Sequence, residues 1–248
     1  MKTTFFTIVL TILLSNSLIA QTEDIEDTKD TSSKFTYPDA YFTFDPINTF
    51  VPVPLPRLNV GYFMPISKSD RWRIGTSVGY GAKQFSIYSE VRKDDYRLWE
   101  IRPQLIYHLK RGTRVKAFFS LELFYINHTE TRENSRFRPE SDFPLIGIGP
   151  SFDENTIGFD QADYRRIKYG FTINYGDYIR FSDRIGLRSS AGIGIRIKDN
   201  QYSNILNPQS NDSDSFVTPY FLKEGVSVGA EVHLSFRLYF TTRKKDKS

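Results

Sequence analysis

Apolar and polar residues alternate along two consecutive stretches near the middle of the chain. The first runs over residues 97–109, the second runs over residues 115–125, and a short polar segment at 110–114 joins them. Alternation with a period of two predicts a β-hairpin with one continuous apolar face and one charged face. Both predicted strands reach the roughly 9–11 residues that a tilted strand needs to cross a bilayer.

The same alternation predicts six further strands, at residues 41–53, 57–66, 71–80, 167–175, 185–196 and 226–240. Short polar turns are expected at 67–70, 110–114 and 180–183, and long connections at 129–163 and 199–224. An even strand count with short turns at one end and long loops at the other is typical of small outer-membrane barrels. We therefore expect an all-β fold, an eight-stranded antiparallel up-and-down transmembrane β-barrel over residues 41–240.

The apolar face of this barrel is expected to point outward. The interior of an eight-stranded barrel is just wide enough to be filled by side chains, so it cannot also hold all the large apolar residues. The opposite face is rich in Gly, Ser, Thr and Asn, which fit inside. Aromatic residues fall near the predicted strand ends, as in interfacial girdles; they are Trp72, Trp99, Tyr107, Tyr125 and Tyr175.

The inward face also carries charges, and buried charges are tolerated when they are paired and hydrogen-bonded. A three-residue turn at 111–113 would place Arg102 directly across from Glu122. We therefore predict an interior ion-pair network that closes the barrel and leaves no open pore, with a gated proton or ion path as the alternative. Its members are Glu100, Arg102, Glu122, Arg188, Arg196, Glu231 and Arg237.

The ends of the chain differ from this pattern. Lys2 and the apolar run at residues 5–14, followed by small residues up to Ala20, predict a secretory signal peptide over 1–20 that is cleaved after Ala20. An acidic leader, expected to be disordered, follows at 21–40, and a basic tail occupies 241–248. The expected location is the outer membrane of a Gram-negative cell.

Composition limits the chemistry. The chain has no cysteine, which rules out disulfides and thiol catalysis. The net charge of +4 is dispersed, so a nucleic-acid partner is not expected. The loop at 211–214 has oxygen ligands but lacks the spacing of a calcium loop. We expect no metal, no cofactor and no catalytic residue.

A lipid-modifying site would need a Ser–His–acid set near the outer leaflet, and the chain has three histidines that could belong to one. His108 falls at the predicted inner end. His128 begins a predicted outer loop. His233 shares a face with Glu231 and Ser235 at mid-barrel. A histidine with satisfied hydrogen bonds is the simpler interpretation of His233.

Several motifs resemble small Gram-negative outer-membrane barrels, and most closely an uncharacterised family known only as a domain of unknown function. The resemblance covers about residues 42–240. It comprises Asn-x-Gly after a proline at 56–61, Arg71-Trp72 after a short turn, and Trp99, Pro103 and Tyr107 on one strand. The resemblance implies that the chain is a substrate of the β-barrel assembly machinery. Its terminal insertion signal would then consist of Phe236, Leu238 and Phe240, and eight further residues follow this signal here.

The predicted function is that of a non-enzymatic outer-membrane β-barrel that acts through its extracellular loops. Such a barrel would contact outer-membrane lipid and could bind a ligand, anchor the envelope or join an envelope complex. Two alternatives remain open at this stage. One is a lipid-modifying barrel enzyme, and the other is a soluble lipocalin-like barrel with its apolar face turned inward around a ligand.

Overall fold

The computed structural model describes residues 40–46, 55–66, 71–85, 95–109, 115–139, 156–182, 184–211 and 223–242. The strands within these ranges are β1 (Tyr41–Phe44), β2 (Leu58–Pro65), β3 (Trp72–Ala82), β4 (Arg97–His108), β5 (Val115–Phe137), β6 (Thr156–Arg180), β7 (Ile185–Leu206), β8 (Gln209–Asn211) and β9 (Gly225–Thr241). A three-residue 3-10 helix, η2 (Lys83–Phe85), follows β3.

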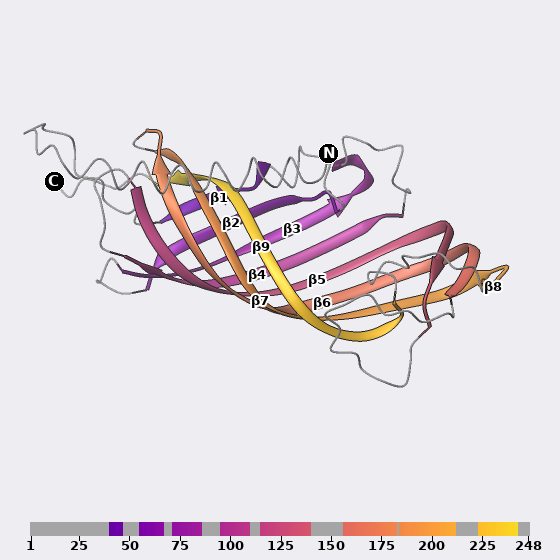
Figure 1. Ribbon diagram of the computed structural model, residues 1–248. Helices are drawn as coiled ribbons and strands as arrows, with labels where there is room; N and C mark the ends of the chain where they lie inside the picture. Colours follow the sequence, from indigo (N-terminus) through magenta and orange to yellow (C-terminus); the bar gives the residue numbers. More distant parts are fainter. Residues whose placement is uncertain are drawn as a thin grey trace, which may run out of the picture.

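Eight of these strands form one closed, antiparallel ring (Figure 1). Neighbours in sequence pair along the ring from β1 to β7, and β9 lies between β7 and β1. Tyr41 closes the ring, since it pairs with Phe63 of β2 on one side and with Thr241 of β9 on the other. The predicted all-β fold of eight antiparallel strands is confirmed. β8 stands outside the ring and pairs with β6.

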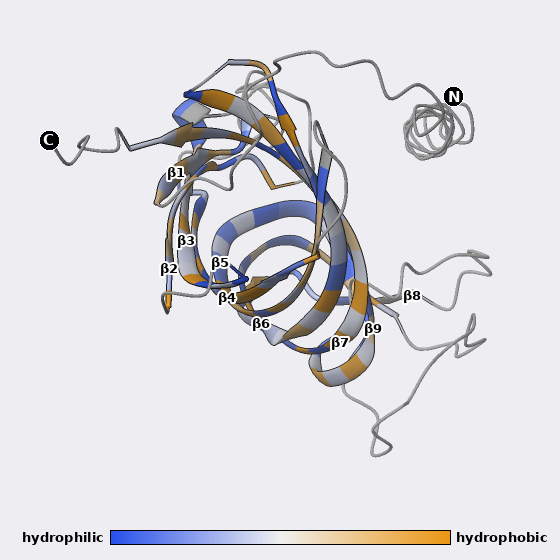
Figure 2. Ribbon diagram, turned by 90° about the vertical axis from the view of Figure 1, so that its left-hand side faces the viewer, coloured by the Kyte–Doolittle hydropathy of each residue, from blue (hydrophilic) through white to orange (hydrophobic). Residues whose placement is uncertain are grey.

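The apolar face of the sheet points outward, and Figure 2 shows how hydrophobic and hydrophilic residues alternate along the strands. Ile173, Ile193 and Val232 are directly opposite one another on β6, β7 and β9, and they are 58%, 73% and 67% exposed. Charged residues of the same strands face the interior and are buried. The lipocalin-like alternative required the opposite arrangement, which the described strands do not have.

Glycines make the narrow interior possible. Several large inward side chains lie directly across from a glycine of the neighbouring strand, as Phe63 does from Gly75 and Phe118 from Gly176. A Cβ atom at Gly75 would collide with the ring of Phe63, and one at Gly176 would come within 2.6 Å of Phe118. Each glycine therefore provides the space that its aromatic partner occupies, as a ring of only eight strands requires.

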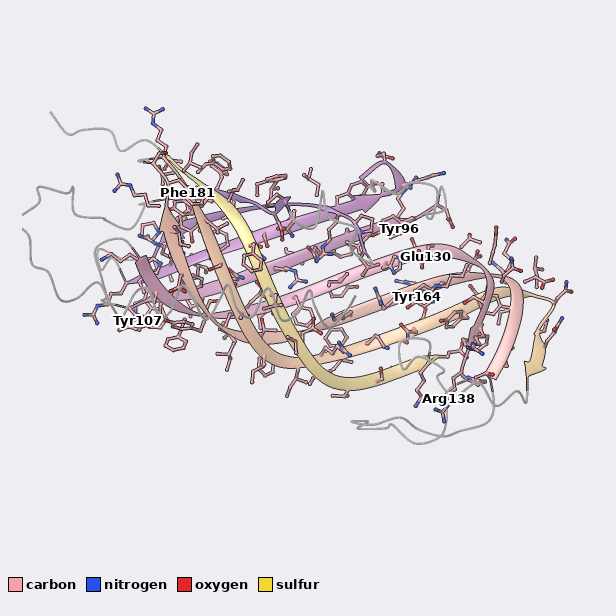
Figure 3. All side chains as sticks on the ribbon, turned by 45° about the horizontal axis from the view of Figure 1, so that its top comes forward. Tyr96, Tyr107, Glu130, Arg138, Tyr164 and Phe181 are labelled. Atoms are coloured by element: carbon pink, nitrogen blue, oxygen red, sulfur yellow. The ribbon has the colours of Figure 1, made fainter. Side chains whose placement is uncertain are left out.

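An aromatic layer fills the interior at the turn end of the ring, where Tyr107 and Phe181 lie in Figure 3. The Tyr41 and Tyr178 hydroxyls are 2.5 Å apart. Alternation placed Tyr239 on the inner face, but a layer of aromatic residues inside the ring was not predicted. Its members are 0–1% exposed, and they are Tyr41, Phe63, Ile106, Phe118, Tyr178 and Tyr239.

Two predicted long loops are in large part strand, which corrects the expected boundaries. β5 continues to Phe137 and β6 begins at Thr156, although a loop was expected over 129–163. β7 continues to Leu206 and is followed by β8, within the loop expected at 199–224. The first strand is shorter than predicted and ends at Phe44, just before Pro46. Pro46 lacks the N–H that a ladder requires.

We call the projecting part of the sheet the extension (Figure 1). It begins at the paired residues Asn127, Ile167 and Asp199 of β5, β6 and β7, and it includes β8. Its own small core consists of Phe137, Phe159, Ala162, Tyr164 and Tyr202. The predicted signal peptide and acidic leader lie outside the described residues except for residue 40, as does the basic tail beyond residue 242.

Candidate functional site: the charged interior

Glu122 of β5 is the centre of the largest polar group inside the ring. It is 0% exposed. Arg102 Nη1 donates to Glu122 Oε1 over 2.7 Å, and Gln104 Nε2 donates to Oε2. His233 Nδ1 lies 3.2 Å from Oε1, and Arg237 Nη2 lies 3.7 Å from Oε2. This carboxylate therefore joins β4, β5 and β9 across the interior.

A second carboxylate, Glu100 of β4, continues this group. Its Oε1 accepts hydrogen bonds from Arg57 Nε over 2.7 Å and from Asn59 Nδ2 over 2.6 Å. Its Oε2 accepts one from Arg102 Nε over 3.1 Å. Arg102 thus bridges two buried carboxylates, which satisfies the requirement that buried charges be paired. Gly79, opposite Glu100, leaves room for the carboxylate, because a Cβ there would lie 2.7 Å from Oε1.

The third carboxylate, Glu231 of β9, forms a separate group with β6 and β7. Lys168 Nζ donates to Oε1 over 2.7 Å, and Arg196 Nη1 donates to Oε2 over 3.1 Å. The predicted members of the ion-pair network therefore fall into two groups, one around Glu100 and Glu122 and one around Glu231.

Arg188 is buried, and it contacts an amide and aromatic rings. Its Nη2 donates to Gln104 Oε1 over 2.6 Å. Its guanidinium carbon lies 4.6 Å from the ring centroid of Phe63 and 4.8 Å from that of Phe118. A guanidinium over aromatic faces gains cation–π attraction. Arg188 therefore connects the polar group above it with the aromatic layer at the turn end.

The register of the β4–β5 hairpin differs from the prediction by two residues. Gln104, and not Arg102, lies directly opposite Glu122. Arg102 still reaches Glu122, since its long side chain spans the diagonal between neighbouring positions. The prediction centred the hairpin on residue 112, whereas the observed pairs are centred on residue 113.

Five further residues belong to these groups but were not among the predicted members of the ion-pair network. Alternation already placed Gln104, Lys168 and His233 on the inner face, so the signal for them was present. Asn59 was placed there too, and Arg57, the first residue of the strand predicted at 57–66, lies two residues before it on the same face. They are Arg57, Asn59, Gln104, Lys168 and His233.

The histidines do not assemble a Ser–His–acid set in the contacts observed. His233 contacts Glu122 of another strand, while Glu231 is engaged by Lys168 and Arg196. His128 lies inside β5 and not at the start of a loop; it is 1% exposed and lies between the rings of Tyr96 and Tyr164.

Glu130 sits near His128 at the base of the extension, where Figure 3 shows it beside Tyr164. The His128 Nε2 atom is 3.4 Å from Glu130 Oε2. Burial lowers the pKa of His128 below its ordinary value, and the nearby Glu130 carboxylate only partly opposes this effect. His128 is therefore neutral in the folded protein at neutral pH.

A cavity of about 240 Å³ lies between the two carboxylate groups. Seven of its lining residues are Arg or Lys and three are Asp or Glu, so its walls carry excess positive charge. β6 and β7 contribute one wall, on which Lys168 and Lys198 are directly opposite each other. Like charges in directly opposed positions destabilise a sheet pair unless something compensates them.

The remaining predicted residues lie on the outer surface of the ring. Phe236, Leu238 and Phe240 occupy alternate positions of β9, and Phe240 is 39% exposed. Among the described residues, helices of the length and hydropathy needed to cross a bilayer are absent. Within the same ranges, no group of three His, Cys, Asp or Glu is arranged to hold a metal ion.

Three comparisons with known proteins returned no match: a scan against protein-family models, a search of curated proteins and a search of solved structures. The resemblance to small outer-membrane barrels therefore rests on the sequence motifs described above.

Proposed function

We propose that this chain is a non-enzymatic outer-membrane β-barrel whose interior is closed by side chains and whose function lies in the extension. The observation that carries the proposal is the inverted burial pattern. Apolar residues surround the outside of a closed ring, and charged residues fill its inside. Water-soluble proteins rarely expose such a continuous apolar surface, whereas lipid is a suitable environment for it.

The dimensions of the ring support a position across a bilayer. β3 has 11 residues and β4 has 12, which is enough for a tilted strand to cross the hydrocarbon core. The pairing of β1 with both β2 and β9 closes the ring over Tyr41–Phe44, and this closure pairs the sheet edges there, as a lipid environment favours. Beyond Tyr125 the outward positions of β5 become polar, beginning with Asn127 and Thr129, and this change marks the outer boundary of the proposed spanning part.

Two aromatic belts border the apolar surface. At the turn end, the rings of Trp72 and Tyr107 are 4.8 Å apart. At the other end, the rings of Trp99 and Tyr125 are 5.0 Å apart. Amphipathic rings favour the interface between lipid and water, so the two belts indicate where the two membrane surfaces would lie.

The filled interior supports a structural or binding role over transport. The aromatic layer, Arg188 and the Glu122 group follow one another from the turn end towards the middle of the ring. An open aqueous pore requires a wider ring than eight strands provide. We therefore assign the function to the extension, where a ligand or an envelope protein could bind. Outer-membrane lipid and, during biogenesis, the β-barrel assembly machinery are the other proposed partners.

Gel mobility and fractionation test the proposal. The full chain is expressed in a Gram-negative host, extracted in detergent from the outer-membrane fraction, and run on a gel with and without boiling. We expect a heat-modifiable band in that fraction and no conductance in a planar bilayer. A soluble protein without a mobility shift would refute the membrane assignment, and steady conductance would refute the closed interior.

A further inference from the structure

Four cations form a compact group on the β6–β7 wall of the cavity, and we call this group the basic patch. It consists of Arg166 and Lys168 of β6 with Arg196 and Lys198 of β7. The register sets Lys168 across from Lys198, and each arginine is two residues from the lysine of its own strand. All four side chains therefore share the inner face of two adjacent strands.

The carboxylates near the basic patch are already shared. Glu231 is held by both Lys168 and Arg196, and Glu100 is held by both Arg57 and Arg102. The positive charges of Arg166, Arg196 and Lys168 all lie close enough to repel that of Lys198, which is only 3% exposed. When the ion pairs of Glu231 and Glu100 are counted, the cavity walls still carry excess positive charge.

Arg166, one of the lining residues, also carries an unsatisfied donor. Its Nε is buried and has no hydrogen-bond partner within the described part of the chain. A buried donor without a partner is costly, and a bound ligand towards which the side chain turns is one way to satisfy it. Excess positive charge and this unpaired donor together favour an acceptor-rich anion.

We propose that the cavity binds a phosphate group, presented either by the free ion or by a small phosphorylated solute. Several acceptor oxygens and more than one negative charge match four converging cations, and charge-assisted hydrogen bonds from Arg and Lys to phosphate are strong. A volume of about 240 Å³ is below that of cavities for drug-sized ligands, so the ligand is small. The inference depends on the folded ring alone and not on its location in a membrane.

Calorimetric titration of the purified, folded chain in detergent tests this site. One titration uses inorganic phosphate, a second uses glycerol 3-phosphate, and a third uses chloride at matched ionic strength. We expect saturable binding of at least one phosphate compound and none of chloride. The compound that binds more tightly identifies whether the free ion or a phosphorylated solute is the source.

Three variants locate the site. K198Q and R166Q should each weaken binding about tenfold or more, because each removes one cation from the basic patch. R165Q is the matched control, since Arg165 is exposed on the opposite face of the same strand, and it should bind like the parent. E231Q should instead bind phosphate more tightly, because it removes the carboxylate that competes for Lys168 and Arg196.

Circular dichroism establishes that each variant is folded. If K198Q does not fold, the difference in phosphate affinity between R165Q and E231Q still tests the site. Equal responses to phosphate and chloride would overturn the proposal. So would saturable phosphate binding that K198Q, R166Q and E231Q leave unchanged, because the site would then lie elsewhere.

Discussion

Replacing Glu122 with Gln tests whether the interior charges stabilise the ring as a connected group. The substitution preserves the shape of the side chain and removes its negative charge. Arg102 keeps its contact with Glu100, and Arg237 keeps a 3.3 Å hydrogen bond from Nη1 to Ser77 Oγ. The variant therefore removes the Glu122 charge from beside the Arg237 guanidinium, which is 3% exposed, and leaves Asp45 as the nearby carboxylate whose charge acts on it.

The expected cost is about 3–5 kcal/mol in the free energy of unfolding, the range found when one partner of a buried ion pair is removed. With a urea dependence of about 2–3 kcal/mol per molar, the unfolding midpoint should fall by about 1–2.5 M. The assay is reversible urea unfolding in detergent followed by tryptophan fluorescence. E133Q is the control on the same strand, because Glu133 is exposed, and it should change stability by less than about 0.5 kcal/mol.

A double variant separates the charge effect from a packing effect. In E122Q/R237Q the uncompensated guanidinium is also removed, so the double variant should be more stable than the sum of its single variants predicts, by about 0.5–3 kcal/mol. If E122Q shifts the midpoint no further than E133Q does, the buried ion pairs contribute nothing measurable and the reasoning is refuted. Additive single effects would refute the coupling.

Three further predictions concern the outer face, the extension and the aromatic layer. I193K places a charge at the most exposed large apolar side chain among the described residues. It should lower the free energy of unfolding by about 2–4 kcal/mol in a bilayer and reduce the heat-modifiable band. S203K in the extension is the control and should do neither. The folded-state pKa of His128 is below its unfolded value, so its contribution to stability is present above the unfolded pKa, about 6.5, and is lost as pH falls below it. Limited proteolysis should therefore cleave the extension faster at pH 5 than at pH 7.5, and H128Q should abolish the difference. Y178F removes one hydroxyl of the 2.5 Å pair with Tyr41 and should lower the free energy of unfolding by about 1 kcal/mol; an unchanged urea midpoint would contradict it.

Alternation predicted the ring well because one face of each strand in the body of the sheet is predominantly apolar, with few exceptions such as Thr76 and Ser189. The same rule failed in the extension. From Asn127 onward β5 has polar residues on both faces, including His128, Glu130 and Arg132 inside, and this pattern is indistinguishable from that of a loop. Pairing with β6 and the aromatic core around Tyr164 stabilise these strands, and neither feature can be derived from periodicity.

For a related reason, the sequence predicted which charged residues lie inside the ring but not how they pair. Assignment of residues to the inner face identifies which charges must find partners, and it identified Glu100, Arg102 and Glu122. It does not identify the partner, because contacts across the ring, such as that between His233 and Glu122, join strands that are not adjacent. Pairs of an inward aromatic residue and a glycine, such as Phe63 and Gly75, can be identified only when the register between the two strands is known.

β6 and β7 connect the cavity with the extension. The aromatic layer and the Glu122 group lie between the cavity and the turn end, and both consist of tightly packed side chains. The wall that carries the basic patch, in contrast, continues into the extension: Arg166 is paired with Asn200, whose Oδ1 accepts a hydrogen bond from the Tyr164 hydroxyl over 2.9 Å. A ligand that draws the four cations together would therefore act on two strands that also belong to the extension.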